Sequence, residues 1–263
     1  MSLAAGRLVV VRGAGDLATG CIVRLVRCGF RVVALEAPEP SAIRRTVCLA
    51  EAVYEGTASV EGVAAFRCDG LPETWSPLGV PVLVDPEARA AGRLAPFALV
   101  DAIVAKRNLG TRIDMAPVVV ALGPGFEAGR DAHAVVETSR GHDLGRVLRQ
   151  GRAAPNTGVP GVIAGHGQGR VVRAPRPGTT SPVRAIGDAV EAGEPLLTVD
   201  GEVVRSAIAG VVRGMIRPGR AVAAGLKVAD VDPRADRESC FTISDKSRAV
   251  SGGVLEAILA LAP

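Results

Sequence analysis

A glycine-rich turn directly after an apolar run is the feature of this sequence that most constrains its fold. Residues 8–11 are apolar, and Gly13 and Gly15 follow in the pattern Gly-x-Gly-x-x-Ala, which ends at Ala18. In dinucleotide-binding βαβ units the first glycine permits the tight turn. The second lets a pyrophosphate approach the backbone, and the small third residue lets helix and strand pack closely. The turn therefore predicts a phosphate site at the start of a helix, and a loop kept only as architecture is the alternative.

The residues after the turn fit the same kind of unit. A helix-like stretch, 19–29, precedes a second apolar run that ends in Glu36, at the spacing where such folds hold a ribose hydroxyl. Arg44 and Arg45 follow near the start of an expected helix. Cations are unfavourable there, so a bound anion would explain the pair, and two solvated arginines are the alternative.

The composition agrees with an α/β protein. Of the 263 residues 48% are hydrophobic and 3% aromatic, so the core is built from Val, Leu, Ile and Ala, which suits a parallel sheet covered by helices. The formal net charge of +4 comes from scattered arginines, without the basic stripe and interleaved aromatics of nucleic-acid-binding proteins. No run of about 18 apolar residues is present. We therefore expect a cytoplasmic protein that binds neither nucleic acid nor membrane. Five cysteines without C-x-x-C spacing argue against a disulfide framework or a zinc site.

Two later loops carry further polar candidates. Lys106 and Asn108 lie in a polar stretch, and Lys106 is one of three lysines in the chain, which favours it as a phosphate contact or proton donor. A second apolar run, 118–122, leads into Gly123-Pro124-Gly125. Ligands of open α/β sheets bind at such strand ends, so this loop is expected to face the first glycine turn.

The stretch after that loop is rich in acid–base groups, namely His133, Glu137, Arg140 and His142. If residues 134–138 form a strand, His133 and Glu137 share a face and could bind a metal or carry out acid–base catalysis. Their spacing matches no standard zinc signature, so the metal stays open, and a surface histidine pair is the alternative.

The later part of the chain contains an internal duplication. Residues 178–199 align with residues 210–231 at a constant offset of 32, so that Gly187 matches Gly219. A unit this short cannot bury its own core, so two copies must interlock in one small β structure. The pattern resembles a biotinyl/lipoyl-type barrel-sandwich hybrid. The tip between the halves is Asp200-Gly201-Glu202, without the carrier lysine, which excludes a carrier function.

We therefore predict an α/β fold with a Rossmann-like nucleotide-binding domain over residues 1–155 and a small all-β barrel-sandwich hybrid over residues 156–235. A C-terminal strand and helix, 236–263, return to the first domain. The final helix is so apolar that it must be buried there or in a dimer, and we expect a homo-oligomer.

Several motifs taken together resemble the YqeB family, which is named for a selenium-dependent molybdenum hydroxylase system. They are GAGDLATG, IRRTVCLAEAVYEG, DAIVAKRNLGT, ALGPGFEAGRDAHAVVETSRGHDLG, NTGVPG, VADVDPR and GGVLEAIL, and they span nearly the whole chain. The resemblance implies an accessory protein that assists molybdenum hydroxylases, for example in maturing or inserting their cofactor. A nucleotide or a molybdopterin dinucleotide is the expected ligand.

The functional hypothesis assigns two groups of residues. The candidate catalytic residues are His133, Glu137, His142 and Lys106, and the candidate ligand-binding residues are Gly13, Gly15, Asp16, Thr19, Glu36, Arg44, Arg45, Asn108, Gly123, Gly125 and Arg140. Asp16 departs from the usual dinucleotide fingerprint, because an acid beside phosphates repels them unless a cation intervenes. Two alternatives are an NAD(P)-dependent oxidoreductase, with His133 or Lys106 as proton donor, and a scaffold that docks a client enzyme without catalysis.

Overall fold

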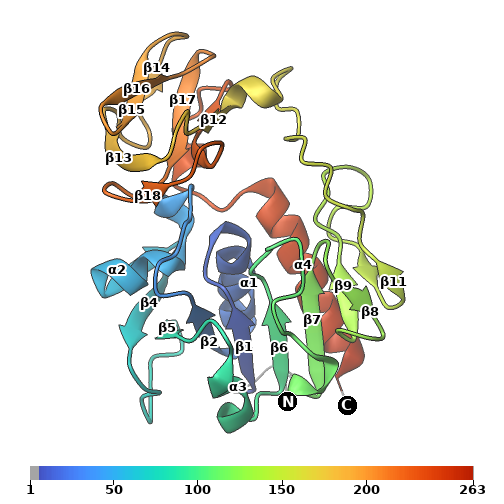
Figure 1. Ribbon diagram of the computed structural model, residues 1–263. Coiled ribbons are helices and arrows are strands. Elements are labelled where there is room, and N and C mark those ends of the chain that lie inside the picture. The colour runs from blue at the N-terminus through green and yellow to red at the C-terminus, as the bar shows by residue number, and fades with distance from the viewer. Residues whose placement is uncertain (1–5, 263) are drawn as a thin grey trace. The chain divides into compact units, whose positions relative to one another are not determined.

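The computed structural model describes residues 6–262 (Figure 1). These residues form two compact units. The first unit comprises residues 6–40, 48–156 and 243–262, and the second comprises residues 41–47 and 157–242. No helix within residues 6–262 combines the length and apolar character needed to span a membrane.

A nine-stranded mixed sheet forms the centre of the first unit, in the order β10-β9-β7-β6-β1-β2-β5-β4-β3. All strands from β9 to β4 in that order run parallel, whereas β10 and β3 are antiparallel to their neighbours at the two edges. The strands are β1 (Leu8–Arg12), β2 (Arg31–Glu36), β3 (Thr57–Val60), β4 (Val63–Cys68), β5 (Gly79–Val84), β6 (Ala98–Asp101), β7 (Val118–Leu122), β9 (Ala134–Val136) and β10 (Val147–Leu148). A separate pair joins β8 (Glu127–Ala128) to β11 (Gly151–Arg152).

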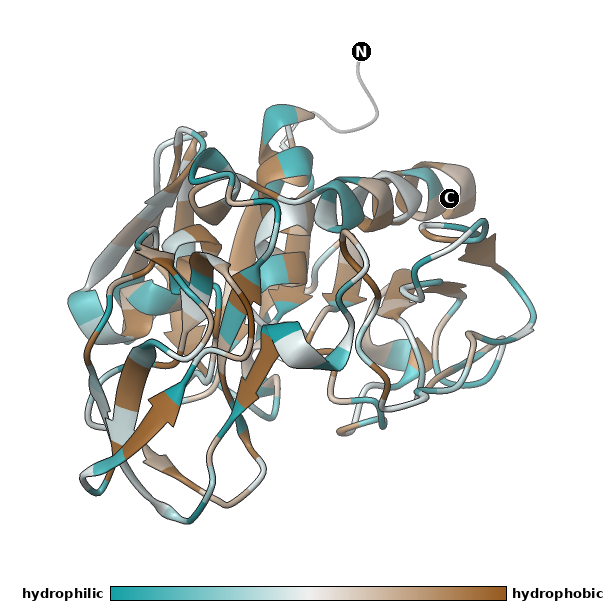
Figure 2. Cartoon of the chain, turned by 90° about the horizontal axis from the view of Figure 1, so that it is seen from above, coloured by the Kyte–Doolittle hydropathy of each residue, from teal (hydrophilic) through white to brown (hydrophobic). Residues whose placement is uncertain are grey.

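The central strands are buried on both faces, which explains their uninterrupted apolar runs. Every residue of β7 is fully buried, and so are the three valines of β1, Val9, Val10 and Val11. Strands buried on both faces lose the alternation of apolar and polar residues that marks a half-exposed sheet. Figure 2 shows the strands largely in the hydrophobic colour, whereas the connecting turns carry most of the hydrophilic one.

The two long helices of the first unit pack against each other. They are α1 (Asp16–Arg27) and α4 (Asp245–Leu261), which lie side by side (Figure 1). Helix α1 contacts β1 and β2, and α4 contacts β7, β9 and β10. Ser244 caps α4, since its side chain accepts a hydrogen bond from the Ser247 N–H. The short helices are α2 (Ala52–Glu55) and α3 (Arg89–Leu94), with 3-10 turns at Arg45–Val47, Leu49–Glu51, Ile113–Met115, Gln168–Arg170 and Glu238–Cys240.

The expectation of a Rossmann-like domain is wrong. A doubly wound fold needs helices that follow its strands and cover both faces. Here the chain passes from β6 to β7 with only the 3-10 turn Ile113–Met115, and from β7 to β9 with only the two-residue β8. The helix that packs on β7 and β9 is α4, which comes from the far end of the chain, and both edge strands are antiparallel.

The second unit contains two four-stranded antiparallel sheets, β12-β19-β17-β14 and β16-β15-β13-β18. Their strands are β12 (Val171–Arg173), β13 (Gly178–Pro182), β14 (Ala189–Val190), β15 (Pro195–Val199), β16 (Glu202–Arg205), β17 (Gly210–Met215), β18 (Ala221–Val222) and β19 (Lys227–Asp232). The first copy of the repeat provides β13–β15 and the second provides β17–β19. Because β14 pairs with β17 and β18 pairs with β13, each copy contributes a short strand to the sheet of the other.

The assignment of this unit as a biotinyl/lipoyl-type barrel-sandwich hybrid is also wrong. The unit is not the self-contained pair of repeats that was expected, because it takes in residues 41–47 from far upstream. The Ile43 carbonyl accepts a hydrogen bond from the Met215 N–H on β17 at 2.8 Å. Residues 41–47 thus pack against the second copy of the repeat.

Candidate functional site

The carboxyl ends of the parallel strands collect most of the candidate residues of the first unit at one edge of the sheet. The glycine turn follows β1, Glu36 ends β2, Asp101 ends β6, Gly123 follows β7 and Glu137 follows β9. Since these strands are parallel, their following loops all lie at the same edge, where open sheets bind ligands. We refer to it as the carboxyl edge.

The glycine turn is tight at Gly13 and open at Gly15. Gly13 has φ +97°, and a Cβ atom there would lie 3.1 Å from the Ala102 carbonyl oxygen, so only glycine fits. A Cβ atom on Gly15 would meet no atom within 4 Å. Gly15 is also the N-cap of α1 and offers no side chain to the free N–H groups of the first turn. The start of α1 therefore has donors available and space in front of them.

Glu36 braces the glycine turn. Its Oε2 accepts the Ala14 N–H and its Oε1 accepts the Ala37 N–H, both at 2.7 Å. Burial raises the pKa of the Glu36 carboxyl, although the two N–H groups act in the opposite direction. Thr19 also stabilises the turn, because its buried hydroxyl donates to the Ala14 carbonyl and accepts the Leu49 N–H, each at 3.0 Å.

A buried ion pair that the sequence analysis missed joins β1 to β6. Arg12 lies 3.3 Å from Asp101, and Thr111 contacts both, donating to Asp101 at 2.6 Å. Arg12 also donates to the carbonyls of Pro86 and Leu109, so it holds the loops after β5 and β6. Burial raises the pKa of Asp101 against the opposing effects of Thr111 and Arg12. The sequence does contain an indication of this ion pair, because Arg12 is a charged residue at the end of an otherwise apolar strand.

The loops after β6 and β7 lie against each other. A Cβ atom on Gly125 would come within 2.6 Å of the Arg107 backbone, and one on Gly123 would collide with the Thr138 hydroxyl. Asn108 shapes its own loop, since its side chain accepts the Gly110 and Thr111 N–H groups and donates to the Thr111 carbonyl. Lys106 is exposed, with φ +64°. The two glycines are thus required for close packing at this edge.

The loop after β9 holds a second group of charges. Glu137 is buried, and its carboxylate accepts the N–H groups of Thr138, Ser139 and Ala154 at 2.6–2.7 Å. Arg140 forms a two-pronged ion pair with Asp245 on α4, at 2.7 and 3.0 Å. His142 in the same loop is exposed.

Lys246, also missed in the sequence analysis, lies beside these charges. It is half-buried in the first turn of α4. Burial first, and the Arg140 guanidinium second, lower the pKa of Lys246, while Asp16, Glu137 and Asp245 act in the opposite direction. Lysine is rare in this chain, and that rarity could have pointed to Lys246. The sequence analysis applied the same argument to Lys106 instead.

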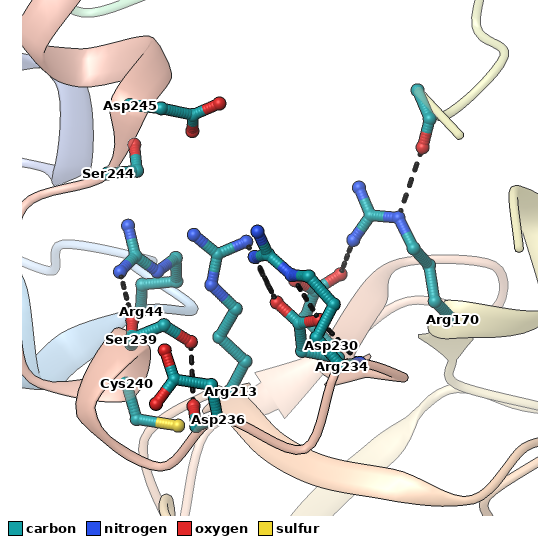
Figure 3. A network of polar contacts seen from close by, with 12 residues as sticks. Arg44, Arg170, Arg213, Asp230, Arg234, Asp236, Ser239, Cys240, Ser244 and Asp245 are labelled. Carbon is teal, nitrogen blue, oxygen red and sulfur yellow. Dashed lines mark hydrogen bonds and ion pairs between the residues drawn. The ribbon is translucent and has the colours of Figure 1, made fainter. Parts of the chain in front are cut away.

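The structure separates three candidates from the carboxyl edge. His133 precedes β9 at the opposite, amino end, where its Nδ1 accepts the Val119 N–H at 3.0 Å. Burial lowers the pKa of His133. Arg44 and Arg45 belong to the second unit. Arg44 donates to the carbonyl of Ser239 (Figure 3) and to that of Thr242. Arg45 donates to the carbonyl of Met215.

The second unit also holds a buried polar network around Asp230. The Arg170 guanidinium lies 2.7 Å from the Asp230 carboxylate (Figure 3). The Lys227 ammonium lies 2.9 Å from the same carboxylate. Throughout residues 6–262, no group of three or more His, Cys, Asp or Glu side chains is placed to hold a metal ion.

One curated relative decides the kinship of the chain. The sequence is 47% identical over 258 residues, 97% of this chain, to the "Uncharacterized protein YqeB" of Escherichia coli (strain K12). The chain is a relative of YqeB. It spans about half the length of YqeB, since the match covers 48% of that protein. The match agrees with the resemblance to the YqeB family drawn from the motifs, and the name YqeB states no activity.

The remaining comparisons add little. No protein-family profile matches the chain. Two solved structures share 14% and 17% identity with it over 86% of its length, each at a TM-score of 0.27: an aspartoacylase family protein from Mesorhizobium loti and a succinylglutamate desuccinylase/aspartoacylase from Rhodobacter sphaeroides. They are covered to 84% and 85% of their own lengths. At this TM-score the likeness carries no argument about fold or function.

Proposed function

We propose that the first unit binds a small phosphate-bearing molecule of the nucleotide or dinucleotide class at its carboxyl edge. The observation that carries the proposal is the open space at Gly15, in front of the uncapped N-terminus of α1. Backbone N–H groups and the helix dipole favour an anion at such a place. Glu36, at the end of the neighbouring strand, has carboxylate oxygens with remaining acceptor capacity for a sugar hydroxyl.

We further propose that this binding serves an accessory role for a molybdenum hydroxylase, with a molybdopterin dinucleotide as one possible ligand. The support is the resemblance of the sequence motifs to the YqeB family, together with the identity to YqeB over half of that protein. The hydride-transfer alternative is not favoured by any observation, since His133 lies at the amino end of β9 with its Nδ1 bonded to the backbone.

The first experiment is native mass spectrometry of the freshly purified protein, followed by denaturing release of whatever it carries. A retained nucleotide or pterin derivative, or binding of added ADP, would support the proposal. A protein that arrives empty and also ignores ADP, GDP and CDP would contradict it and favour the client-binding scaffold.

The variant Gly15→Val tests the place of binding. A Cβ atom there would meet no other atom within 4 Å, so the main cost is the replacement of a favourable N-cap glycine, which should lower the free energy of unfolding by about 1 kcal/mol. The valine side chain fills the space in front of α1, and losing two charged hydrogen bonds should weaken ADP binding more than about a hundredfold. Gly92→Val, at an equally open position on α3, is the matched control. Unchanged affinity in Gly15→Val would exclude the glycine turn as the site.

A further inference from the structure

A cavity of about 690 Å³ lies in the first unit, beside the carboxyl ends of β4 and β5. Residues of the segments 68–71 and 83–94 line it, and none of them belongs to the glycine turn. The volume is within the range of pockets that bury most of a drug-sized ligand. The cavity is therefore a candidate for a ligand separate from the one at the glycine turn.

Part of the cavity wall is apolar. Leu83 is buried in the core of the first unit, and Leu71 and Leu94 pack against the same core. Cys68 belongs to this wall as well, and burial first, followed by the charge of Asp69, raises the pKa of its thiol. A protonated thiol behaves as a small apolar group, so this wall favours contact with hydrocarbon.

The charges at the start of α3 are engaged within the protein. The Asp85 carboxylate accepts the N–H groups of Arg89 and Ala90 at 3.0 and 2.7 Å. Glu87 forms an ion pair with the Arg89 guanidinium at 2.6 Å. These contacts hold the start of the short helix and neutralise its first arginine.

Two further charged side chains line the cavity, Asp69 and Arg93, and they are not engaged in this way. Within residues 6–262, neither of them makes a hydrogen bond or an ion pair. Asp69 directly follows β4, whereas Arg93 lies on α3, on the same face as Arg89 four residues earlier. The cavity thus offers a ligand one carboxylate and one guanidinium from two different walls, with apolar side chains beside them.

We propose that this cavity binds a small zwitterion whose ammonium and carboxylate are separated by an apolar body, as in a short apolar peptide with free termini. The Asp69 carboxylate accepts the ammonium, and the planar fork of Arg93 donates to the carboxylate. Leu71, Leu83 and Leu94 contact the apolar body. A zwitterion is expected because only a ligand with both charges satisfies both side chains. The inference goes beyond the proposed function and does not depend on it.

The test follows the Cys68 thiol, because a ligand in the cavity covers it. The full chain is labelled with N-ethylmaleimide, and peptide mass spectrometry follows Cys68 and Cys28 separately. Cys28 is an exposed thiol at the end of α1 and serves as the internal control. The dipeptide leucyl-leucine should slow the labelling of Cys68 in proportion to its occupancy and leave that of Cys28 unchanged.

Matched ligands and variants separate the two charges. N-acetyl-leucyl-leucine lacks the ammonium and leucyl-leucine amide lacks the carboxylate, so each should bind about three- to tenfold more weakly. Asp69→Asn should abolish the preference over the acetylated form, and Arg93→Met should abolish the preference over the amide. Both variants remove an exposed charge without a partner, so the melting temperature should stay unchanged. Arg112→Met, which removes an exposed arginine outside the cavity, is the control and should bind as the wild type does.

Three results would overturn the inference. An unchanged labelling rate of Cys68 with leucyl-leucine and with ω-aminooctanoate, a second zwitterion with an apolar body, would exclude a ligand of this class. Equal protection by leucyl-leucine and by both of its capped forms would show that the cavity recognises apolar surface alone. Protection by ADP in place of the dipeptide would assign the cavity to the nucleotide of the proposed function.

Discussion

Single polar side chains hold the loops of the carboxyl edge in place. Glu36 and Glu137 accept backbone N–H groups from the segments around them, and Asn108 does the same for its own loop. Buried backbone groups must be paired, and loops cannot pair them through a sheet ladder. These side chains therefore set the shape of the edge.

His133 allows a pH test at the residue scale. Burial lowers its pKa below the ordinary value of about 6.5, so the unfolded chain binds the proton more tightly than the folded one. Protonation also removes the acceptor that Nδ1 offers to the Val119 N–H. The contribution of His133 to stability is thus complete above about pH 6.5 and is lost as the pH falls through the folded pKa.

The comparison variant for this test is His133→Asn, whose Oδ1 matches the position of Nδ1 along the side chain and can accept the Val119 N–H but does not titrate. Urea unfolding between pH 7.5 and 5 should show the wild type losing stability relative to the variant as the pH falls. Parallel curves would mean that His133 titrates normally in the folded protein.

At the scale of elements, α4 packs closely on α1 and on the loop after β9 through small residues. Gly20 faces Ser247, and Gly253 faces the Gly145 carbonyl, each where a Cβ atom would collide. Close approach here places the first turn of α4 beside that of α1, where the Ser247 hydroxyl donates to the Asp16 carbonyl. Small residues therefore set how closely α4 approaches α1.

Gly20→Ala tests this contact against helix propensity. In an exposed helix interior the change stabilises by about 1 kcal/mol, but here the added Cβ overlaps Ser247, and overpacking costs about 1–3 kcal/mol. We expect a net loss in urea unfolding, with partial recovery in Gly20→Ala/Ser247→Gly.

The matched control is Gly252→Ala on α4, where the nearest atom is the end of the Arg24 side chain at 3.7 Å. This variant should gain about 1 kcal/mol from helix propensity. A stabilising effect of Gly20→Ala equal to that of Gly252→Ala would contradict the tight contact.

At the scale of the whole molecule, the second unit depends on a piece of chain from the first half of the sequence. Ile43 accepts the Met215 N–H, and Arg45 donates to the Met215 carbonyl at 2.8 Å. Gly214 makes room for this segment, because a Cβ atom there would lie 2.7 Å from the Ile43 carbonyl oxygen. The chain thus passes from one unit to the other four times, and neither unit is a continuous stretch of sequence.

Gly214→Ala should therefore destabilise the protein by about 1–3 kcal/mol through overpacking and expose residues 41–47 to proteolysis. Limited proteolysis with urea unfolding checks both effects. Gly167→Ala is the control, since its nearest contact would be an ordinary 3.7 Å, and it should change stability by less than about 0.5 kcal/mol. Identical behaviour of the two variants would mean that the upstream segment is not held by β17.

Local patterns by themselves determined the first strand, the glycine turn, the helix that begins at it, the buried strand 118–122 and the repeat. Each of these depends on residues near one another in the chain, namely a turn that only glycine permits, an apolar run or a short period. The kinship with YqeB was likewise readable from the motifs.

Only the tertiary structure decided which segments cover the sheet and which charges meet. The fold expectation failed because α4, rather than a local crossover helix, packs on β7 and β9, and because residues 41–47 join the second unit. Arg44 belongs to the second unit rather than to the glycine turn for the same reason. Burial and charge pairing act between residues that are close in space, and no local pattern records how distant segments fold together.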